Sequence, residues 1–185
     1  MKNFQLDELT EEKLELVKNA WLGLIPEDNH EVFRAECSQL FDVISLGKSW
    51  GDLGDRLNVP IYQSVKDGDD VWALVQIVQS KVGAATWVKL MDIHLSPAID
   101  VFPDTECNTE NRLKVFIAAL LGILSLAKRA RRADTFKVFG RTEALVTFLQ
   151  GMHDVLSTIA TIGTIKGVDV SIEGRWLVFR ATDDH

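Results

Sequence analysis

Residues 109–131 read TENRLKVFIAALLGILSLAKRAR, and the fold of the chain depends on this stretch. A capping residue opens it, and its centre is apolar on nearly every face of a helix. Such a helix is buried, and the other elements pack around it. We therefore predict a central apolar helix at about 109–131. Its most apolar run, 115–127, has 13 residues, which is short of the roughly 20 that cross a bilayer.

The segments before this helix are also predicted to be mainly helical. Thr10 caps a helix that Pro26 ends, and Asn29 caps a second one that stops at Gly47. A short turn between two amphipathic helices favours an antiparallel hairpin. A short helix is expected at 49–57. The runs 71–82 and 86–95 fit a helix or a buried strand, and we favour the helix while keeping the strand open.

The clearest strand pattern lies at the C-terminus. Residues 168–172 alternate between apolar and polar, Glu173-Gly174 suits a two-residue turn, and 175–179 return. Because a lone hairpin is barely stable in water, this one must pack on other elements. The fold class predicted is therefore α+β: a predominantly helical single domain, 1–185, with the central helix and a C-terminal β-hairpin at about 168–181.

The charge of the chain reverses locally. The net charge is −7 and the isoelectric point about 5.1, yet residues 111–141 hold eight basic residues against one acid. Cations at a helix end stabilise the helix dipole, but one or two would suffice. We therefore predict a basic patch at 128–141 that binds an acidic partner or an anionic surface. The binding residues predicted are Lys128, Arg129, Arg131, Arg132, Lys137 and Arg141.

The partners predicted for this patch are acidic proteins or a second copy of the chain. Residues 1–70 carry 15 acids and 7 bases, so complementary charge exists within the protein itself. RNA or an anionic membrane surface remains an alternative. Sequence-specific DNA is disfavoured, because a helix-turn-helix reading of 49–65 would place three aspartates beside the DNA. Arg175, Trp176 and Arg180 form a second predicted interface.

Catalytic and metal signatures are weak. No His or Cys spacing matches a zinc site, neither cysteine has a nucleophile signature, and no cofactor is expected. The favoured function is a non-enzymatic interaction protein that can self-assemble, of the viral structural, immunity or secretion-accessory type. A nucleic-acid-binding protein or regulator is the second hypothesis, and an enzyme with a site not visible in sequence is the third. Cys37 and Cys107 without a signal peptide or a transmembrane segment indicate the cytoplasm, or a host-cell interior for a pathogen protein.

Overall fold

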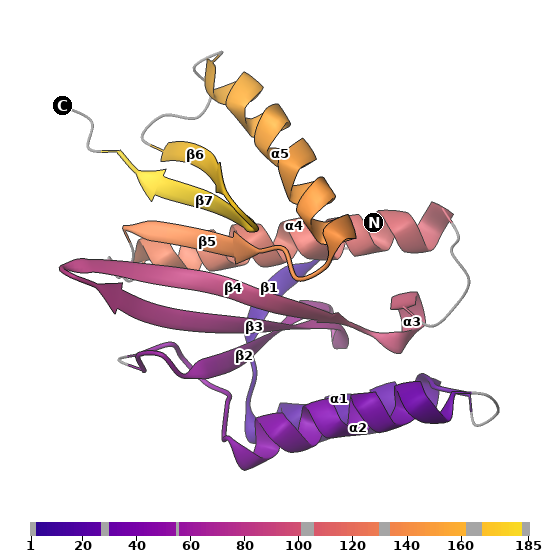
Figure 1. The fold of residues 1–185 in the computed structure, drawn as a ribbon. Coiled ribbons are helices and arrows are strands. Elements are labelled where there is room, and N and C mark those ends of the chain that lie inside the picture. The colour runs from indigo at the N-terminus through magenta and orange to yellow at the C-terminus, as the bar shows by residue number, and fades with distance from the viewer. Residues whose placement is uncertain are drawn as a thin grey trace.

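The computed structural model describes residues 3–26, 30–54, 56–100, 106–129, 134–161 and 168–182. These residues form a seven-stranded sheet with helices on both faces (Figure 1). No described helix combines the length and the apolar character that a membrane crossing requires. The elements in chain order are β1 (Gln5–Glu8), α1 (Glu11–Leu24), α2 (Glu31–Leu46), β2 (Pro60–Asp67), β3 (Asp70–Val82), β4 (Ala85–Leu95), α3 (Pro97–Asp100), α4 (Glu106–Arg129), β5 (Thr135–Phe139), α5 (Glu143–Thr161), β6 (Val168–Glu173) and β7 (Trp176–Ala181).

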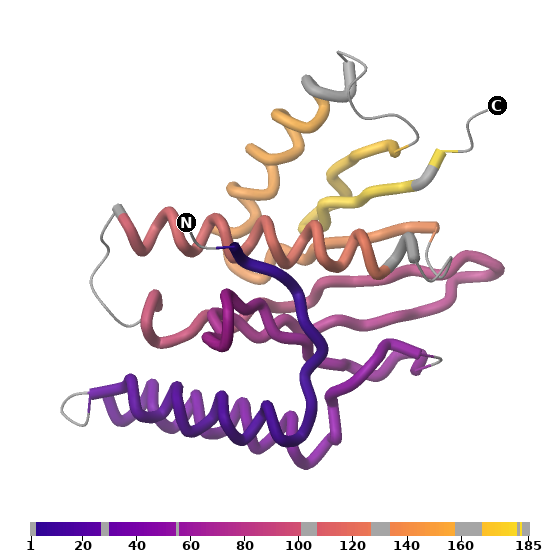
Figure 2. The backbone as a smooth tube through the Cα atoms, turned by 180° about the vertical axis from the view of Figure 1, so that it is seen from behind, coloured from indigo at the N-terminus to yellow at the C-terminus, as the bar shows by residue number. Residues whose placement is uncertain are grey.

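The strands follow the spatial order β1-β2-β3-β4-β5-β7-β6. Neighbouring strands are antiparallel except for β4 and β5, which are parallel and are joined by a crossover that contains α4. The hairpin of α1 and α2 lies on one face of the sheet, and α4 lies on the other (Figure 1). Viewed from behind, β1 runs from beside α4 to the start of α1 (Figure 2).

The predicted fold class is wrong, because the protein is built on this mixed sheet and is not a predominantly helical domain. The predicted central helix corresponds to α4, but α4 covers one face of the sheet. The C-terminal hairpin corresponds to β6 and β7, which form one end of the same sheet. Its turn is Gly174-Arg175, one residue later than predicted, and Gly174 has a φ of +61° that favours glycine.

The helix favoured at 71–82 is wrong, because this run forms strand β3. Successive residues of a strand face opposite sides, and β3 is buried on both. Leu74 packs in the core beneath α1 and α2, whereas Val75 packs in the core beneath α4. A strand with two buried faces reads as a continuous apolar run, which resembles a buried helix in sequence.

The helix favoured at 86–95 is also wrong, and a β-bulge explains the misleading pattern. Gln76 of β3 is opposite Asp92 of β4, but Ile77 is opposite Leu90, so Met91 is an extra residue in β4. The bulge brings Leu90 and Ile93 to the same face of the sheet, three residues apart. That spacing is helical, so the sequence of a bulged strand imitates a helix.

The helix-turn-helix reading fails as well. Residues 49–54 and 56–58 contain no helix, and three of them have positive φ: Gly51 at +96°, Gly54 at +47° and Asn58 at +59°. Residues in the left-handed region interrupt a right-handed helix. The segment expected as the second helix lies in strand β2.

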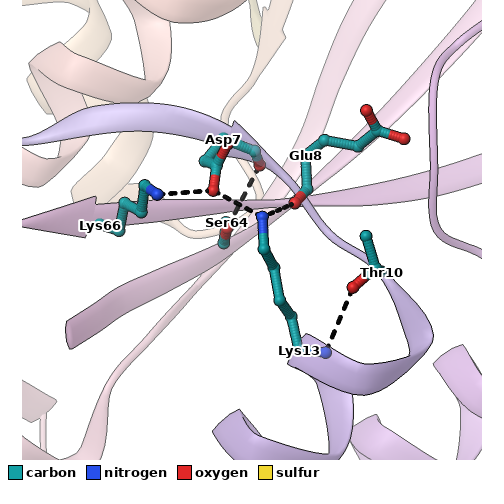
Figure 3. A network of polar contacts seen from close by, with 6 residues as sticks. All are labelled: Asp7, Glu8, Thr10, Lys13, Ser64 and Lys66. Carbon is teal, nitrogen blue, oxygen red and sulfur yellow. Dashed lines mark hydrogen bonds and ion pairs between the residues drawn. The ribbon is translucent and has the colours of Figure 1, made fainter. Parts of the chain in front are cut away.

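Strand β1 is fixed to the rest of the sheet and to α1 by one carboxylate (Figure 3). Asp7 accepts hydrogen bonds from Lys13 at 2.8 Å and is ion-paired with Lys66 at 2.9 Å. Burial opposes ionisation of Asp7, but these two lysines together hold the pKa of its carboxyl below the usual value. Thr10 caps α1 as predicted, accepting from the Lys13 backbone N–H at 3.3 Å.

Candidate functional site

An opening in the sheet lies where the two parallel strands end. Within β4, only residues 87–90 pair with β5, which ends at Phe139, whereas β4 continues to Leu95. The edge of residues 91–95 that faces away from β3 therefore has no partner among the described strands. In open sheets, the carboxyl ends of parallel strands are where ligands bind. The bulge at Met91 leaves a further backbone position of β4 outside the ladder at the same place.

Two clefts meet at this end of β4. The larger, about 610 Å³, lies between α2 and β4 and is called the α2 cleft. The smaller, about 240 Å³, lies between α4, α5 and β4 and is called the α4–α5 cleft. Ile93 and Leu95 line both, so the end of β4 is the wall between them. Other residues of the α2 cleft include Trp21, Phe33, Glu36, Cys37, His94, Asp100 and Arg141, and those of the α4–α5 cleft are Asp92, Arg112, Leu113, Phe116, Leu145 and Phe148.

Polar side chains gather at the wall between the clefts. Asp92 forms an ion pair with Arg141, which comes from the turn between β5 and α5. The carboxylate of Asp92 also accepts a hydrogen bond from the Ile93 backbone N–H at 2.9 Å. The Nε2 atom of His94 lies 3.6 Å from Asp92 Oδ2. One carboxylate thus connects the strand end, the β5–α5 turn and an imidazole.

The imidazole of His94 is held in its neutral form. Burial lowers its pKa, the nearby Asp92 carboxylate opposes that effect, and the Arg141 guanidinium adds to it. The net pKa is below the usual value of 6.5, so the ring is neutral at pH 7 and can accept a proton. Its ring lies 6.1 Å, centroid to centroid, from that of Tyr62, whose hydroxyl accepts a hydrogen bond from Gln76 at 2.8 Å.

Cys37 lines the α2 cleft but is not a nucleophile. Burial raises the pKa of its thiol to about 11, and the nearby Arg34 only partly offsets that effect. Because the thiolate is the nucleophilic form, Cys37 is inert at neutral pH. Among the residues that the structure describes, no group of three His, Cys, Asp or Glu side chains could hold a metal ion.

Of the predicted basic patch, the structure describes the side chains of Lys137 and Arg141, which have different surroundings. Arg141 lies at the site just described. Lys137 is buried in β5, where it pairs with Glu173 at 2.8 Å and lies 4.1 Å from the ring of Trp87. Lys128 and Arg129 belong to the last turn of α4, and their side chains lie outside the description, as do Arg131 and Arg132 altogether. Binding of an acidic partner and self-association stay predictions.

The second predicted interface is also divided. Arg175 donates to the carbonyl oxygens of Gly140 at 2.7 Å and Arg141 at 2.8 Å, and pairs with Glu143 at 2.6 Å. It therefore fixes the turn that carries Arg141. Trp176 packs on Phe139, with ring centroids 4.8 Å apart. Arg180 pairs with Glu173, the partner of Lys137.

Sequence reasoning missed Asp92, His94 and Tyr62 as members of one site. The pair Asp92 and His94 was visible, but residues two apart do not share a helix face. On a strand they do, and Asp92 and His94 are opposite Gln76 and Leu74, which are likewise two residues apart on β3. Correct assignment of β4 as a strand would have revealed the pair.

Several solved structures are similar to this chain over most of its length. An N-acetyltransferase from Thermoplasma acidophilum, PaiA, in complex with coenzyme A, is 12% identical with a TM-score of 0.38, covering 97% of this chain and 99% of that one. A GNAT family acetyltransferase from Brucella melitensis in complex with acetyl-CoA is 10% identical with a TM-score of 0.44, covering 100% and 92%. The Campylobacter jejuni N-acetyltransferase PseH is 11% identical with a TM-score of 0.38, covering 98% and 99%. No protein-family model and no curated protein matches the sequence.

These findings contradict the sequence-based prediction of a non-enzymatic interaction protein, and we correct it. The reason for the error is physical. The prediction rested on a charge cluster that is continuous in sequence, whereas the site is assembled from β4, α2 and the β5–α5 turn.

Proposed function

We propose that this chain is an acyltransferase that moves an acyl group from a thioester to an amine. The observation that carries the proposal is the opening beside residues 91–95, with one cleft on each side and the neutral His94 at the wall between them. Two clefts that meet at one point suit two substrates that react with each other. Acetyl transfer is the activity named for the solved structures above, but the proposal stands on this geometry.

Each cleft has the chemistry of one substrate. The α4–α5 cleft is lined mainly by apolar side chains such as Leu113, Phe116 and Phe148, which suit the uncharged arm of a thioester. The α2 cleft combines aromatic side chains with the carboxylates of Glu36 and Asp100, which suit an amine on an apolar body.

The reaction follows from this placement. The amine nitrogen attacks the thioester carbonyl carbon at the end of β4, a C–N bond forms and the C–S bond breaks. His94 accepts the proton that the attacking amine loses, and the departing thiolate takes a proton from solvent. Beyond Leu90, the edge of β4 that faces away from β3 has no strand partner among the described residues, so backbone N–H groups on that edge, other than the one of Ile93 that donates to Asp92, can donate to the carbonyl oxygen. The Asp92 carboxylate, itself held by Arg141, lies 3.6 Å from His94 and balances the positive charge that the ring gains.

The test uses the purified protein with acetyl-CoA or S-acetyl-N-acetylcysteamine as donor and a panel of hydrophobic primary amines as acceptors. Released thiol is followed with a thiol-reactive dye, and the acetylated amine is identified by mass spectrometry. We expect His94→Asn to lower kcat/KM by about 10²–10⁴, the usual contribution of a general base. His153→Asn is the matched control, because His153 lies on α5 outside both clefts. Thiol release that never exceeds the rate in buffer, with either donor, would refute the proposal.

We also propose that the protein acts in the cytoplasm. Cys37 and Cys107 are both free thiols, as in proteins of a reducing compartment.

A further inference from the structure

We infer that the thioester donor of this site carries no nucleotide diphosphate, so that coenzyme A gains little from its phosphates here. The inference rests on the proposed function and names the class of its donor. Two of the solved structures named above hold coenzyme A or acetyl-CoA.

The segment that leads from the opening to α4 lacks the means to bind phosphate. Residues 90–111 contain no lysine, no arginine and no glycine. Proteins bind a diphosphate at a helix N-terminus through backbone N–H groups, and glycines allow the close approach. Of the described side chains in this stretch, Asp92, Asp100 and Glu110 are acidic, and carboxylates repel phosphate.

The described cations nearest to this end of α4 already have partners. Arg112 donates from Nε to the carbonyl oxygen of Ile99 at 2.6 Å, an interaction that ties α3 to α4. Lys114 is paired with Glu110 at 2.5 Å, and Arg141 is paired with Asp92. A diphosphate would have to compete with a carboxylate or a carbonyl oxygen for each of them.

The basic residues at the other end of α4 are too far away to help. Lys128 lies 16 residues beyond Arg112 in the same helix, which is about 24 Å at 1.5 Å per residue. The apolar α4–α5 cleft remains, and its Leu113, Phe116 and Phe148 suit the uncharged part of the donor. The site therefore recognises the thioester arm and not a nucleotide.

The test compares binding of coenzyme A and pantetheine to the unmodified protein by titration calorimetry. Pantetheine has the same thiol arm without the nucleotide. We expect coenzyme A to bind no tighter than pantetheine, and its affinity to be insensitive to added salt. Coenzyme A that binds more than about tenfold tighter, or that weakens steeply with salt, would overturn the inference, as would binding of neither.

A charge-reversal pair checks the cause. Glu110→Arg places a cation at the start of α4, whereas Glu11→Arg makes the same change at the start of α1, away from both clefts. We expect Glu110→Arg to raise the affinity for coenzyme A relative to pantetheine by several-fold, and Glu11→Arg to leave the ratio unchanged. An equal response of both variants, or of neither, would contradict the role of the acidic segment.

The binding experiment and the activity assay can fail separately. If the protein releases thiol from acetyl-CoA and coenzyme A binds far tighter than pantetheine, the inference fails and the proposed function stands. If pantetheine binds as well as coenzyme A but no amine is acetylated from either donor, the proposed function fails, and the conclusion that the phosphates add no affinity stands.

Discussion

Gly122 and Gly151 predict opposite responses to the same substitution. Both lie inside helices, Gly122 in α4 and Gly151 in α5. A Cβ atom at Gly122 would lie 2.4 Å from Cβ of Leu6 in β1, whereas a Cβ atom at Gly151 would meet nothing within 4 Å. Carbon atoms in contact normally lie about 3.5–4.0 Å apart. Strand β1 and α4 must therefore separate by about 1 Å in Gly122→Ala.

The magnitudes follow from two opposing effects. Alanine is better than glycine in a helix interior by about 0.8–1.0 kcal/mol, and both variants gain this amount. Forcing an extra methyl group into a packed contact costs about 1–3 kcal/mol, and only Gly122→Ala pays it. We expect Gly151→Ala to be stabilised and Gly122→Ala to be about 1–3 kcal/mol less stable than Gly151→Ala.

Urea unfolding followed by circular dichroism measures both variants on the same scale. In thermal unfolding, the difference corresponds to roughly 2–4 °C in Tm per kcal/mol for a chain of this size. Equal stabilisation of the two variants would show that α4 does not rest on β1 at Gly122, and would refute the packing described here.

Three further predictions concern the site and the sheet. The kcat/KM should rise with pH through an apparent pKa below 6.5, because burial lowers the pKa of His94. In a pH–rate profile, His94→Asn should lack this rise, and a flat wild-type profile would contradict the role of His94. Cys37→Ser should keep full turnover, and loss of turnover would instead make Cys37 part of the reaction. In the folded protein, alkylation followed by mass spectrometry should label the exposed Cys107 but not Cys37. Truncation after Lys166 should give an aggregating or unfolded protein, because β5 loses its neighbour β7 and the core loses the buried side chains of Leu177 and Phe179. A truncated chain with an unchanged cooperative thermal unfolding transition would show that the hairpin is dispensable.

The lowered pKa of His94 in the folded protein also makes the stability depend on pH. A histidine whose pKa is lower in the folded than in the unfolded state contributes stability above the unfolded value. That contribution is lost as the pH falls from 6.5 through the folded pKa of His94. The variant lacks this titration, so only the wild type loses stability in this way. The difference in urea midpoint between the wild type and His94→Asn should therefore be smaller at pH 5 than at neutral pH.

Local signals in the sequence determined several elements of this protein. Thr10 and the acidic first turn of α1 specify where that helix starts, because side-chain capping acts over three residues. The alternation of 168–179 specifies two paired strands, because side chains of a strand alternate between faces. Even there, the turn was displaced by one residue, since both Glu173-Gly174 and Gly174-Arg175 contain the glycine that a tight turn needs.

Only the tertiary structure decided the state of residues 71–95. Strand β3 has cores on both faces and β4 has a bulge at Met91, and each feature removes the simple alternation by which a strand is recognised. The site depends on the same decision. The parallel pairing of β4 with β5 brings Arg141 to Asp92 across 49 positions of sequence. A contact of that kind is a property of strand order in the sheet, which no local pattern of residues encodes.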